Sequence, residues 1–304
     1  MDDETMMPES NAWTQKMSSL FFKKVSHIEN LPLLKNIFPQ HPEQYINQDD
    51  LTGFRKVQTL ALHATKEVAK QLKPGWTETQ TARILDGFLK DAGVHHFFHK
   101  SFVWFGDRTR FRGVKNYHDY APTSRRMREK DVFILDVAPI LDGYIADVGY
   151  SGSLVENKEF EEAMHFLQEL RGTIPTLCRS LANGSQLVGA LAESIAKAGY
   201  ENIHETYPFG VLGHRIHKTP SFTETPLSIL NFGSASYLSY FGRGVFGQLL
   251  NRHHEGDLVG LWAIEPHIAT SSWGVKFEEI LVITKTEAYW LSDEMHAFYR
   301  GQSL

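Results

Sequence analysis

Acidic residues inside apolar segments are the first sign of chemistry in this chain, because an uncompensated charge is costly to bury. Asp136 lies within the apolar run 133–139, and the turn signal Asp142-Gly143 follows it. A two-residue turn there places Ala138 opposite Asp147, so that Asp136 and Asp147 become diagonal neighbours roughly 7–8 Å apart along the backbone. Two carboxylates this close repel unless a cation compensates them. For either aspartate alone, a turn cap or a pair with a nearby arginine is an equal alternative.

A second predicted hairpin carries the same kind of residue. Glu265 lies in the apolar segment 261–266, and the adjacent acids Glu278 and Glu279 lie in the next one. His214, between Gly213 and Arg215, adds an imidazole. Four carboxylates and an imidazole are the ligands that a pair of divalent transition metals prefers. The periodicity of the strand does not decide between the two adjacent glutamates.

The elements that must position these residues come in a repeated order. Apolar residues recur every three or four positions where helices are expected, and β-rich runs with turn signals follow them. Thr77, with Gln80 three residues on, has the spacing of a capping box. In order, we expect helices over 51–72 and from 77 to before 93, strands over 132–138 and 144–150, helices over 157–181 and 185–198, and strands over 259–268 and 276–284.

Two helix-helix-hairpin halves follow from this order, and each ends in acid-bearing strands. Pro74-Gly75, a helix and Ala92-Gly93 in the first half correspond to Asn183-Gly184, a helix and Ala198-Gly199 in the second. The pattern predicts a duplicated α+β domain with a site between its halves. Chance is the alternative, because loosely alternating elements are common.

Composition and charge narrow the class of protein. The 304 residues are 42% hydrophobic and 22% charged, as in a folded globular protein. The net charge of −5 and the lack of a long basic run argue against a nucleic-acid partner. The single cysteine, Cys178, fits a reducing compartment. The first residues lack the pattern of a signal peptide, and no apolar run is long enough for a membrane span, so we expect a cytoplasmic protein.

Several short motifs occur in order between Leu51 and Ala288. They are Lys73-Pro74-Gly75-Trp76-Thr77, Asn116-Tyr117-His118 with Asp136 eighteen residues after His118, Asp147 eleven residues later, Gly213-His214, Ile264-Glu265-Pro266 and Phe277-Glu278. Each is weak alone, but together they resemble the pita-bread metallohydrolases, the family of methionine aminopeptidase, aminopeptidase P, prolidase and creatinase. The resemblance implies an α+β pita-bread fold, with the duplicated halves around a curved antiparallel sheet.

Carried over position by position, the resemblance implies a centre of two divalent metal ions, which would be manganese, cobalt, iron or zinc. Five residues would hold them, with Asp136 on one metal, His214 and Glu265 around the other, and Asp147 and Glu278 as bridges. Only the motif alignment prefers Glu278 to Glu279. A water between two such ions is acidic enough to act as the nucleophile near neutral pH. Glu265 would move its proton, and His118 would bind the substrate or the developing oxyanion.

The chain departs from the family pattern just after the metal histidine. The peptidases usually have a second, substrate-binding histidine seven residues later, where this chain has Ser221. This change argues against peptide hydrolysis unless His217 takes over the role, and a structural position for His217 is the equal alternative. Arg215 replaces a small residue, and we expect Arg215 or His217 to enter the cavity and favour a substrate carboxylate. The alternative is that Arg215 turns away to pair with an acid such as Glu224.

Two segments lie outside the family pattern. Residues 1–50 are expected to form an extension of the catalytic domain 51–304, and residues 229–255, rich in glycine and aromatic residues, an insertion. Such an insertion serves either as a lid over the site or as a contact between the two copies of a homodimer. The remaining histidines are expected to be solvated or locally hydrogen-bonded rather than bound to metal, namely His95, His96, His99, His253 and His254.

We therefore expect a metal-dependent hydrolase of peptide or small amide bonds, most like an Xaa-Pro aminopeptidase or dipeptidase. The extension, the insertion and the altered histidine region argue against a methionine aminopeptidase. One alternative is a non-peptidase enzyme, either a hydrolase of small amides and amidines or a lyase. The other is a catalytically silent binding protein, against which the complete set of four acids and one histidine argues.

Overall fold

The computed structural model describes residues 46–114, 117–219, 228–229, 232–233 and 245–293. In the first half these residues form α3 (Gln48–Gln71), α4 (Glu78–Asp91), β1 (His96–Phe105), β2 (Val132–Leu141), β3 (Tyr144–Ile145) and β4 (Val148–Ser153), with 3-10 turns at Gly106–Arg110 and Tyr117–Tyr120. The second half begins with α5 (Lys158–Ser180), α6 (Gly184–Lys197), β5 (Glu201–Asn202), 3-10 turns at His204–Thr206 and Pro208–Gly210, and β6 (Gly213–Arg215). It continues with β7 (Ser228–Ile229), β8 (Phe232–Gly233), α8 (Val245–Gln248), β9 (Leu249–Leu250), β10 (Gly260–Ile264), β11 (His267–Ala269), β12 (Gly274–Lys276), β13 (Glu279–Ile283) and β14 (Ala288–Trp290).

The four long helices begin at side-chain caps that the sequence displays. Asn47, Thr77, Asn157 and Asn183 each accept a hydrogen bond from a backbone N–H in the first turn of α3, α4, α5 and α6 respectively. Beyond the end of α3, Gly75 adopts a φ of +92°, which suits a glycine in the turn before α4. The predicted helices are confirmed, and α5 runs through Pro175.

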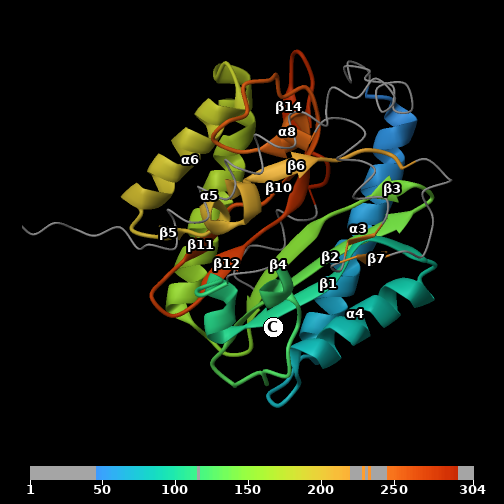
Figure 1. Ribbon diagram of the computed structural model, residues 1–304, viewed down its shortest axis with the longest axis vertical. Helices are drawn as coiled ribbons and strands as arrows, with labels where there is room; N and C mark the ends of the chain where they lie inside the picture. The colour runs from blue at the N-terminus through green and yellow to red at the C-terminus, as the bar shows by residue number, and fades with distance from the viewer. Residues whose placement is uncertain (1–45, 115–116, 220–227, 230–231, 234–244, 294–304) are drawn as a thin grey trace, which may run out of the picture.

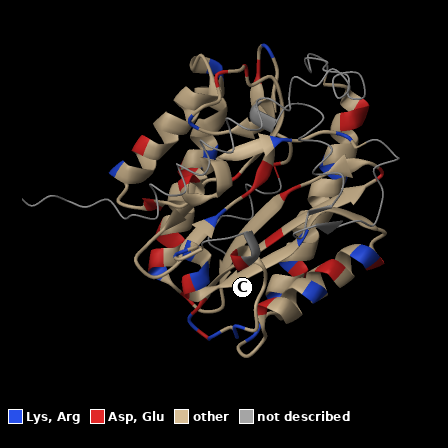
Figure 2. Ribbon diagram, in the orientation of Figure 1, with Lys and Arg blue, Asp and Glu red and all other residues tan. Residues whose placement is uncertain are grey.

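Three antiparallel sheets lie between the helix pairs. One has the order β3-β2-β1-β8-β7 with β4 also paired to β2, the second β14-β13-β10-β6-β9 and the third β12-β11-β5. Figure 1 shows α3 and α4 on one side of the strands and α5 and α6 on the other. The two halves are joined by an antiparallel bridge between Gly149 and Glu278. The acid-bearing strands of both halves therefore meet in the middle of the molecule, where acidic segments are visible on the strands (Figure 2).

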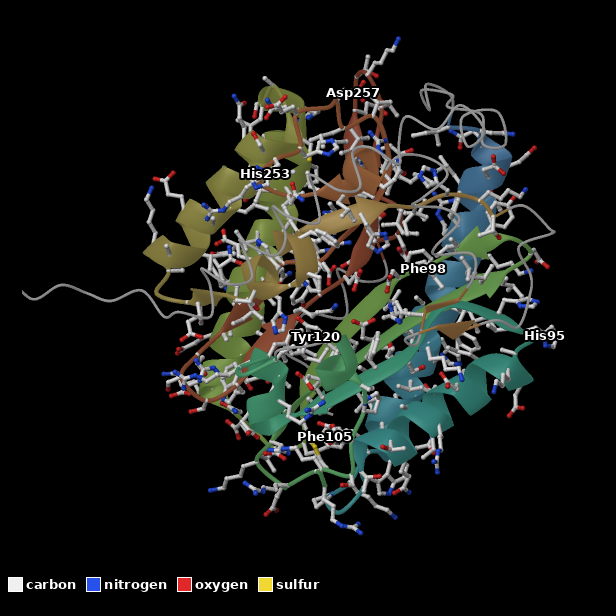
Figure 3. All side chains as sticks on the ribbon, viewed as in Figure 1. His95, Phe98, Phe105, Tyr120, His253 and Asp257 are labelled. Carbon is white, nitrogen blue, oxygen red and sulfur yellow. The ribbon has the colours of Figure 1, made fainter. Side chains whose placement is uncertain are left out.

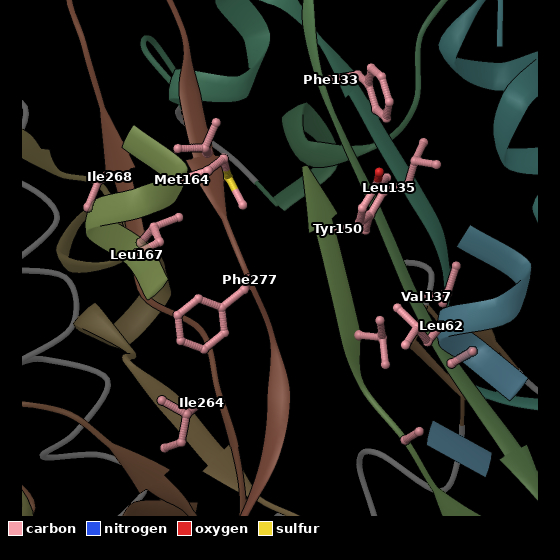
Figure 4. Close-up of a cluster of buried hydrophobic side chains, with 14 of the residues drawn as sticks. Leu62, Phe133, Leu135, Val137, Tyr150, Met164, Leu167, Ile264, Ile268 and Phe277 are labelled. Carbon is pink, nitrogen blue, oxygen red and sulfur yellow. The ribbon is translucent and has the colours of Figure 1, made fainter. Parts of the chain in front are cut away.

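Successive side chains of β2 point to opposite faces of the strand, so one face packs in the core and the other carries Asp136. Phe133, Leu135 and Val137 point into the main hydrophobic core, where they join Leu62 of α3 (Figure 4). Asp136 lies on the opposite face of the same strand. The core thus fixes the strand that presents this carboxylate.

Two predicted segments fall partly outside the described residues. These are the extension 1–50, of which only residues 46–50 are described, and the insertion 229–255, of which parts are described. In the part of the chain that the structure covers, no helix is both long and apolar enough to cross a bilayer.

Candidate metal centre

The hairpin that carries Asp136 and Asp147 has the predicted register. Asp142 and Gly143 both have positive φ values, 54° and 80°, as the central residues of a type I′ turn require. Leu141 pairs with Tyr144, and the same register continues to Asp136, which pairs with Gly149. Ala138 therefore lies opposite Asp147, and the two aspartates become diagonal neighbours. Both are buried.

Glu278 reaches the two aspartates through the bridge between the halves. The backbone N–H of Glu278 donates to Gly149 O at 3.2 Å, and the N–H of Gly149 donates to Glu278 O at 3.4 Å. Because Gly149 is also the partner of Asp136, the three residues form a row across the joined strands. This row brings an acid of the second hairpin beside an acid of the first.

His214 lies on β6, and Glu265 directly follows the neighbouring strand β10. His214 pairs with Ala263, and the N–H of Glu265 donates to Leu212 O at 2.8 Å. Gly213 is required at this crossing, because a Cβ there would lie 2.2 Å from Ala263 O. The Nε2 atom of His214 lies 3.2 Å from Asp147 Oδ2 and 3.8 Å from Glu278 Oε1.

His99 makes a local contact of the kind expected, with Nδ1 at 3.0 Å from Lys100 O, but its other ring nitrogen also joins this cluster. It is buried on β1, with Nε2 at 3.2 Å from Asp147 Oδ1 and 3.4 Å from Asp136 Oδ1. Burial lowers the pKa of His99, but the charges of Asp147 and Asp136 outweigh it and raise that pKa to about 9. Strand pairing brings His99 to the aspartates, since β1 lies antiparallel to β2 and pairs His99 with Ala138, opposite Asp147.

The other histidines of that group lie elsewhere. His95 and His253 are exposed, near opposite sides of the molecule in Figure 3. His254 is buried and its Nδ1 lies 3.0 Å from Leu249 O, a local hydrogen bond of the kind expected.

Lys276 is the second residue that the sequence reasoning missed. Its ammonium donates to Asp136 Oδ2 at 2.7 Å and to Glu265 Oε2 and Glu278 Oε2 at 2.8 Å each. Burial acts to lower the pKa of Lys276, but the three carboxylates outweigh it and hold that pKa well above its usual value. The signal was present in the sequence, because Lys276 stands two residues before Glu278 in a strand-like segment and so shares its face.

The adjacent acids Glu278 and Glu279 point to opposite faces. Glu279 accepts two hydrogen bonds from the buried Arg171, at 2.8 Å from Nε and 2.7 Å from Nη2. Burial raises the pKa of Glu279 to about 7, with Arg171 opposing part of the rise. The structure thus places Glu278 in the acidic cluster and Glu279 in a separate ion pair.

Arg215 does not enter the cluster, so it turns away as in the alternative, although it binds backbone carbonyls rather than an acid. Its guanidinium donates to the backbone carbonyls of Gly247, Val259 and Asp257 and lies 4.3 Å above the ring of Trp262. Backbone acceptors therefore engage the side chain that was expected to bind a substrate carboxylate.

The remaining predicted residues are placed only in part. His217 is buried, and its Nε2 contacts Gln248 Oε1. His118 lies in the 3-10 turn Tyr117–Tyr120, but its side chain is outside the described residues, as are Ser221 and Glu224.

The pKa values of two acids in the cluster, Asp147 and Glu278, are shifted in opposite directions. Burial opposes ionisation of Asp147, but His99 and His214 hold its pKa well below the usual value. Burial, together with Asp147 and Glu265, raises the pKa of Glu278 well above its usual value, although Lys276 opposes the rise. Two groups of atoms are close enough to share one metal ion, with all ligand atoms of a group within 4.8 Å, namely His99, Asp136 and Asp147, and Asp147, His214 and Glu278.

Comparison with known proteins gives the same fold. Metallopeptidase family M24 matches residues 52–285. A methionine aminopeptidase from Archaeoglobus fulgidus is 26% identical over 158 residues, which are 52% of this chain and 51% of that protein. The chain thus spans about half the length of this curated relative.

Solved structures of lower sequence identity share the same fold. An X-Pro aminopeptidase from Thermotoga maritima superimposes with a TM-score of 0.62 at 17% identity, covering 83% of this chain and 63% of that one. A prolidase from Pyrococcus furiosus gives a TM-score of 0.60 at 17% identity, with coverages of 82% and 65%. The chain belongs to metallopeptidase family M24 and has the pita-bread fold, an α+β architecture, that its motifs predict.

Proposed function

We propose that this chain hydrolyses peptide or small amide bonds with the help of bound divalent metal, most like an Xaa-Pro aminopeptidase or dipeptidase. The observation that carries the proposal is the convergence of four buried carboxylates and two histidines from both halves of the domain. The family match supports it, because family M24 consists of metallopeptidases. A short peptide or amide substrate, a cytoplasmic location and a homodimer belong to the same proposal.

The residues of the cluster fit a divalent metal on the side of the two histidines. Asp136 Oδ1 is buried there without a hydrogen-bond partner, and Asp147 presents one oxygen to each histidine. Either of the two groups that share Asp147 would hold a metal ion, namely His99, Asp136 and Asp147, or Asp147, His214 and Glu278. When bound, it would supply polarisation of the amide carbonyl and activation of water.

Proton transfer is assigned to Glu265. Burial raises its pKa above the usual value, with Lys276 opposing the rise, which suits a carboxyl group that must both accept and release a proton. We propose that His118 binds the oxygen of the substrate amide. His217 would take over substrate binding from the second histidine that the family usually has where this chain has Ser221. The domain boundaries at 50 and the insertion at 229–255 stay predictions alongside these roles.

A substrate screen tests the proposal. The full chain is stripped of metal, supplied separately with manganese, cobalt, iron or zinc, and assayed on dipeptides, Xaa-Pro peptides and small amides. Metal-dependent hydrolysis that disappears in Asp147→Ala supports the proposal, and Lys218→Met is the matched control on the surface. Absence of hydrolysis by metal-loaded protein on the whole panel would contradict it.

Lys276 favours a second candidate, a catalytically silent binding protein of this fold. The sequence argument against such a protein was that it has no need of four converging acids. The ammonium of Lys276 already compensates three of them, so the acids alone do not require a metal. Metal content below about half an equivalent in a well-folded sample purified without chelator would favour this candidate.

A further inference from the structure

The oxygens of the acidic cluster are divided between two sides. Asp136 directs Oδ2 to Lys276 and Oδ1 toward His99, while Glu278 directs Oε2 to Lys276 and Oε1 toward His214. Lys276 therefore faces one side of these two carboxylates, and the histidines face the other. This division is the arrangement expected of carboxylates that bridge two cations.

On its side, Lys276 has the surroundings of a bound cation. It is 2% exposed, and its three acceptors come from three separate strands or strand ends. A divalent ion bound to the same three oxygens would lie within a few ångströms of the ammonium, where like charges repel strongly in a buried site. The ammonium and a second metal ion thus compete for one position.

Gly149 makes room for the lysine side chain. A Cβ atom at this position would lie 2.4 Å from Lys276 Cε and 3.0 Å from Glu278 Cβ. Gly149 has no positive φ that would demand glycine for the backbone alone. The close approach of the lysine is therefore the physical reason for a glycine between Asp136 and Glu278.

We propose that Lys276 takes the place of one of the two expected cations, so that the cluster holds a single divalent metal ion on the side of His99, Asp147 and His214. This inference rests on the proposed function only in so far as the cluster is a metal centre. It departs from the expectation of two metal ions, and it would make Glu265 a partner of Lys276 rather than a metal ligand.

The test is a count of bound Mn²⁺ per full-length chain, by elemental analysis after gel filtration and by calorimetric titration. We expect about one equivalent in the wild type and about two in Lys276→Met, in which the three carboxylates lose their ammonium. Gly149→Ala, which crowds the lysine, is expected to move the count in the same direction. Lys218→Met is the control, because Lys218 contacts Asp50 and Tyr144 on the surface and should leave the count at one.

Several outcomes would overturn the proposal. A wild-type count of two shows that Lys276 excludes no metal, and a count of zero shows that there is no single metal site. An unchanged count of bound Mn²⁺ in folded Lys276→Met would show that the ammonium does not compete with a second metal ion. If the variants do not fold, the wild-type count still decides. Hydrolysis measured on the same samples separates the two proposals, since one bound metal without hydrolysis contradicts only the proposed function.

Discussion

Glu278 and Glu279 are neighbours in the chain and equally hidden from solvent, yet they lie in contrasting surroundings. Both oxygens of Glu279 are bound by Arg171, whose Nη2 also donates to Ser292 O at 3.1 Å. Glu278 instead shares Lys276 with Asp136 and Glu265. One glutamate belongs to a closed ion pair and the other to a crowded group of acids.

The difference separates a structural ion pair from a site that can accept a ligand. One guanidinium satisfies one carboxylate in the Arg171–Glu279 pair, so nothing further is needed. In the cluster, one ammonium and two imidazoles face four carboxylates, and Asp136 Oδ1 has no hydrogen-bond partner. Excess acid that points inward is stabilised by an added cation, whereas a paired acid is not.

The largest expected effect is the loss of metal on removal of a shared carboxylate. Asp147→Ala and Glu278→Ala should each weaken Mn²⁺ binding by at least about 100-fold and abolish hydrolysis, because each removes a ligand from the cluster. Circular dichroism at low temperature should still show a folded chain. Tight metal binding in either variant would mean that the metal lies elsewhere.

The opposite pattern is expected for the ion pair. Arg171→Met leaves Glu279 buried without a partner and should lower the free energy of unfolding by about 3 kcal/mol, measured by urea denaturation. Mn²⁺ binding should stay within about 3-fold of the wild type, a much smaller change than the loss of a ligand produces. A large loss of metal affinity in the folded variant would erase the distinction between the two glutamates. Arg171→Met/Glu279→Gln should recover part of the stability.

Substitutions of His99 and His118 distinguish a metal-binding residue of the cluster from a residue that acts on the substrate. His99→Ala should weaken Mn²⁺ binding about 10- to 100-fold, because its Nε2 faces both aspartates. His118→Ala should leave Mn²⁺ binding intact and lower turnover about 100-fold, as for a lost acid-base or oxyanion contact. Titration of Mn²⁺ and steady-state kinetics on both variants separate the roles. Intact Mn²⁺ binding in His99→Ala together with weakened Mn²⁺ binding in His118→Ala would contradict these roles.

The smallest effect concerns His204, a buried histidine outside the acidic cluster. Burial, with the charge of Arg252, lowers the pKa of His204 to about 3, whereas an unfolded histidine titrates near 6.5. Below pH 6.5 the unfolded chain therefore gains a proton that the folded chain does not, so this group destabilises the fold as the pH falls toward 3. Between pH 7 and 5.5 the loss is about 1 kcal/mol.

Urea denaturation at both pH values checks this contribution. His204→Asn should show a smaller loss of stability on acidification than the wild type, by about the same 1 kcal/mol. The exposed His165, replaced in the same way, is the control. Equal acid sensitivity of wild type and His204→Asn would contradict the assignment.

Much of the fold followed from local signals in the sequence. The cap at Thr77 and the Asp142-Gly143 turn act over a few residues, so their effect is visible in the sequence, whereas the cap at Asn47 lies in the segment expected to be an extension. The turn also fixed the register that makes Asp136 and Asp147 diagonal neighbours. The order of motifs supplied the rest of the acidic set.

The contacts that were missed depend on long-range pairing. His99 reaches Asp147 only because β1 and β2 lie side by side, and Lys276 reaches Asp136 across 140 residues of sequence. Arg215 turns away from the cluster, and three backbone carbonyls accept from its guanidinium. Its position after His214 carries no information on those acceptors, which lie more than 30 residues away.

The central claim is that this cluster holds one metal ion beside a lysine ammonium. An anomalous difference map from a crystal soaked in Mn²⁺ tests it most directly, because the map locates each ion among the side chains. The account predicts one peak, between Nε2 of His99 and Nε2 of His214, with Lys276 Nζ still bound to Glu265. A second peak at the position of the ammonium, or no peak in the cluster, would contradict it.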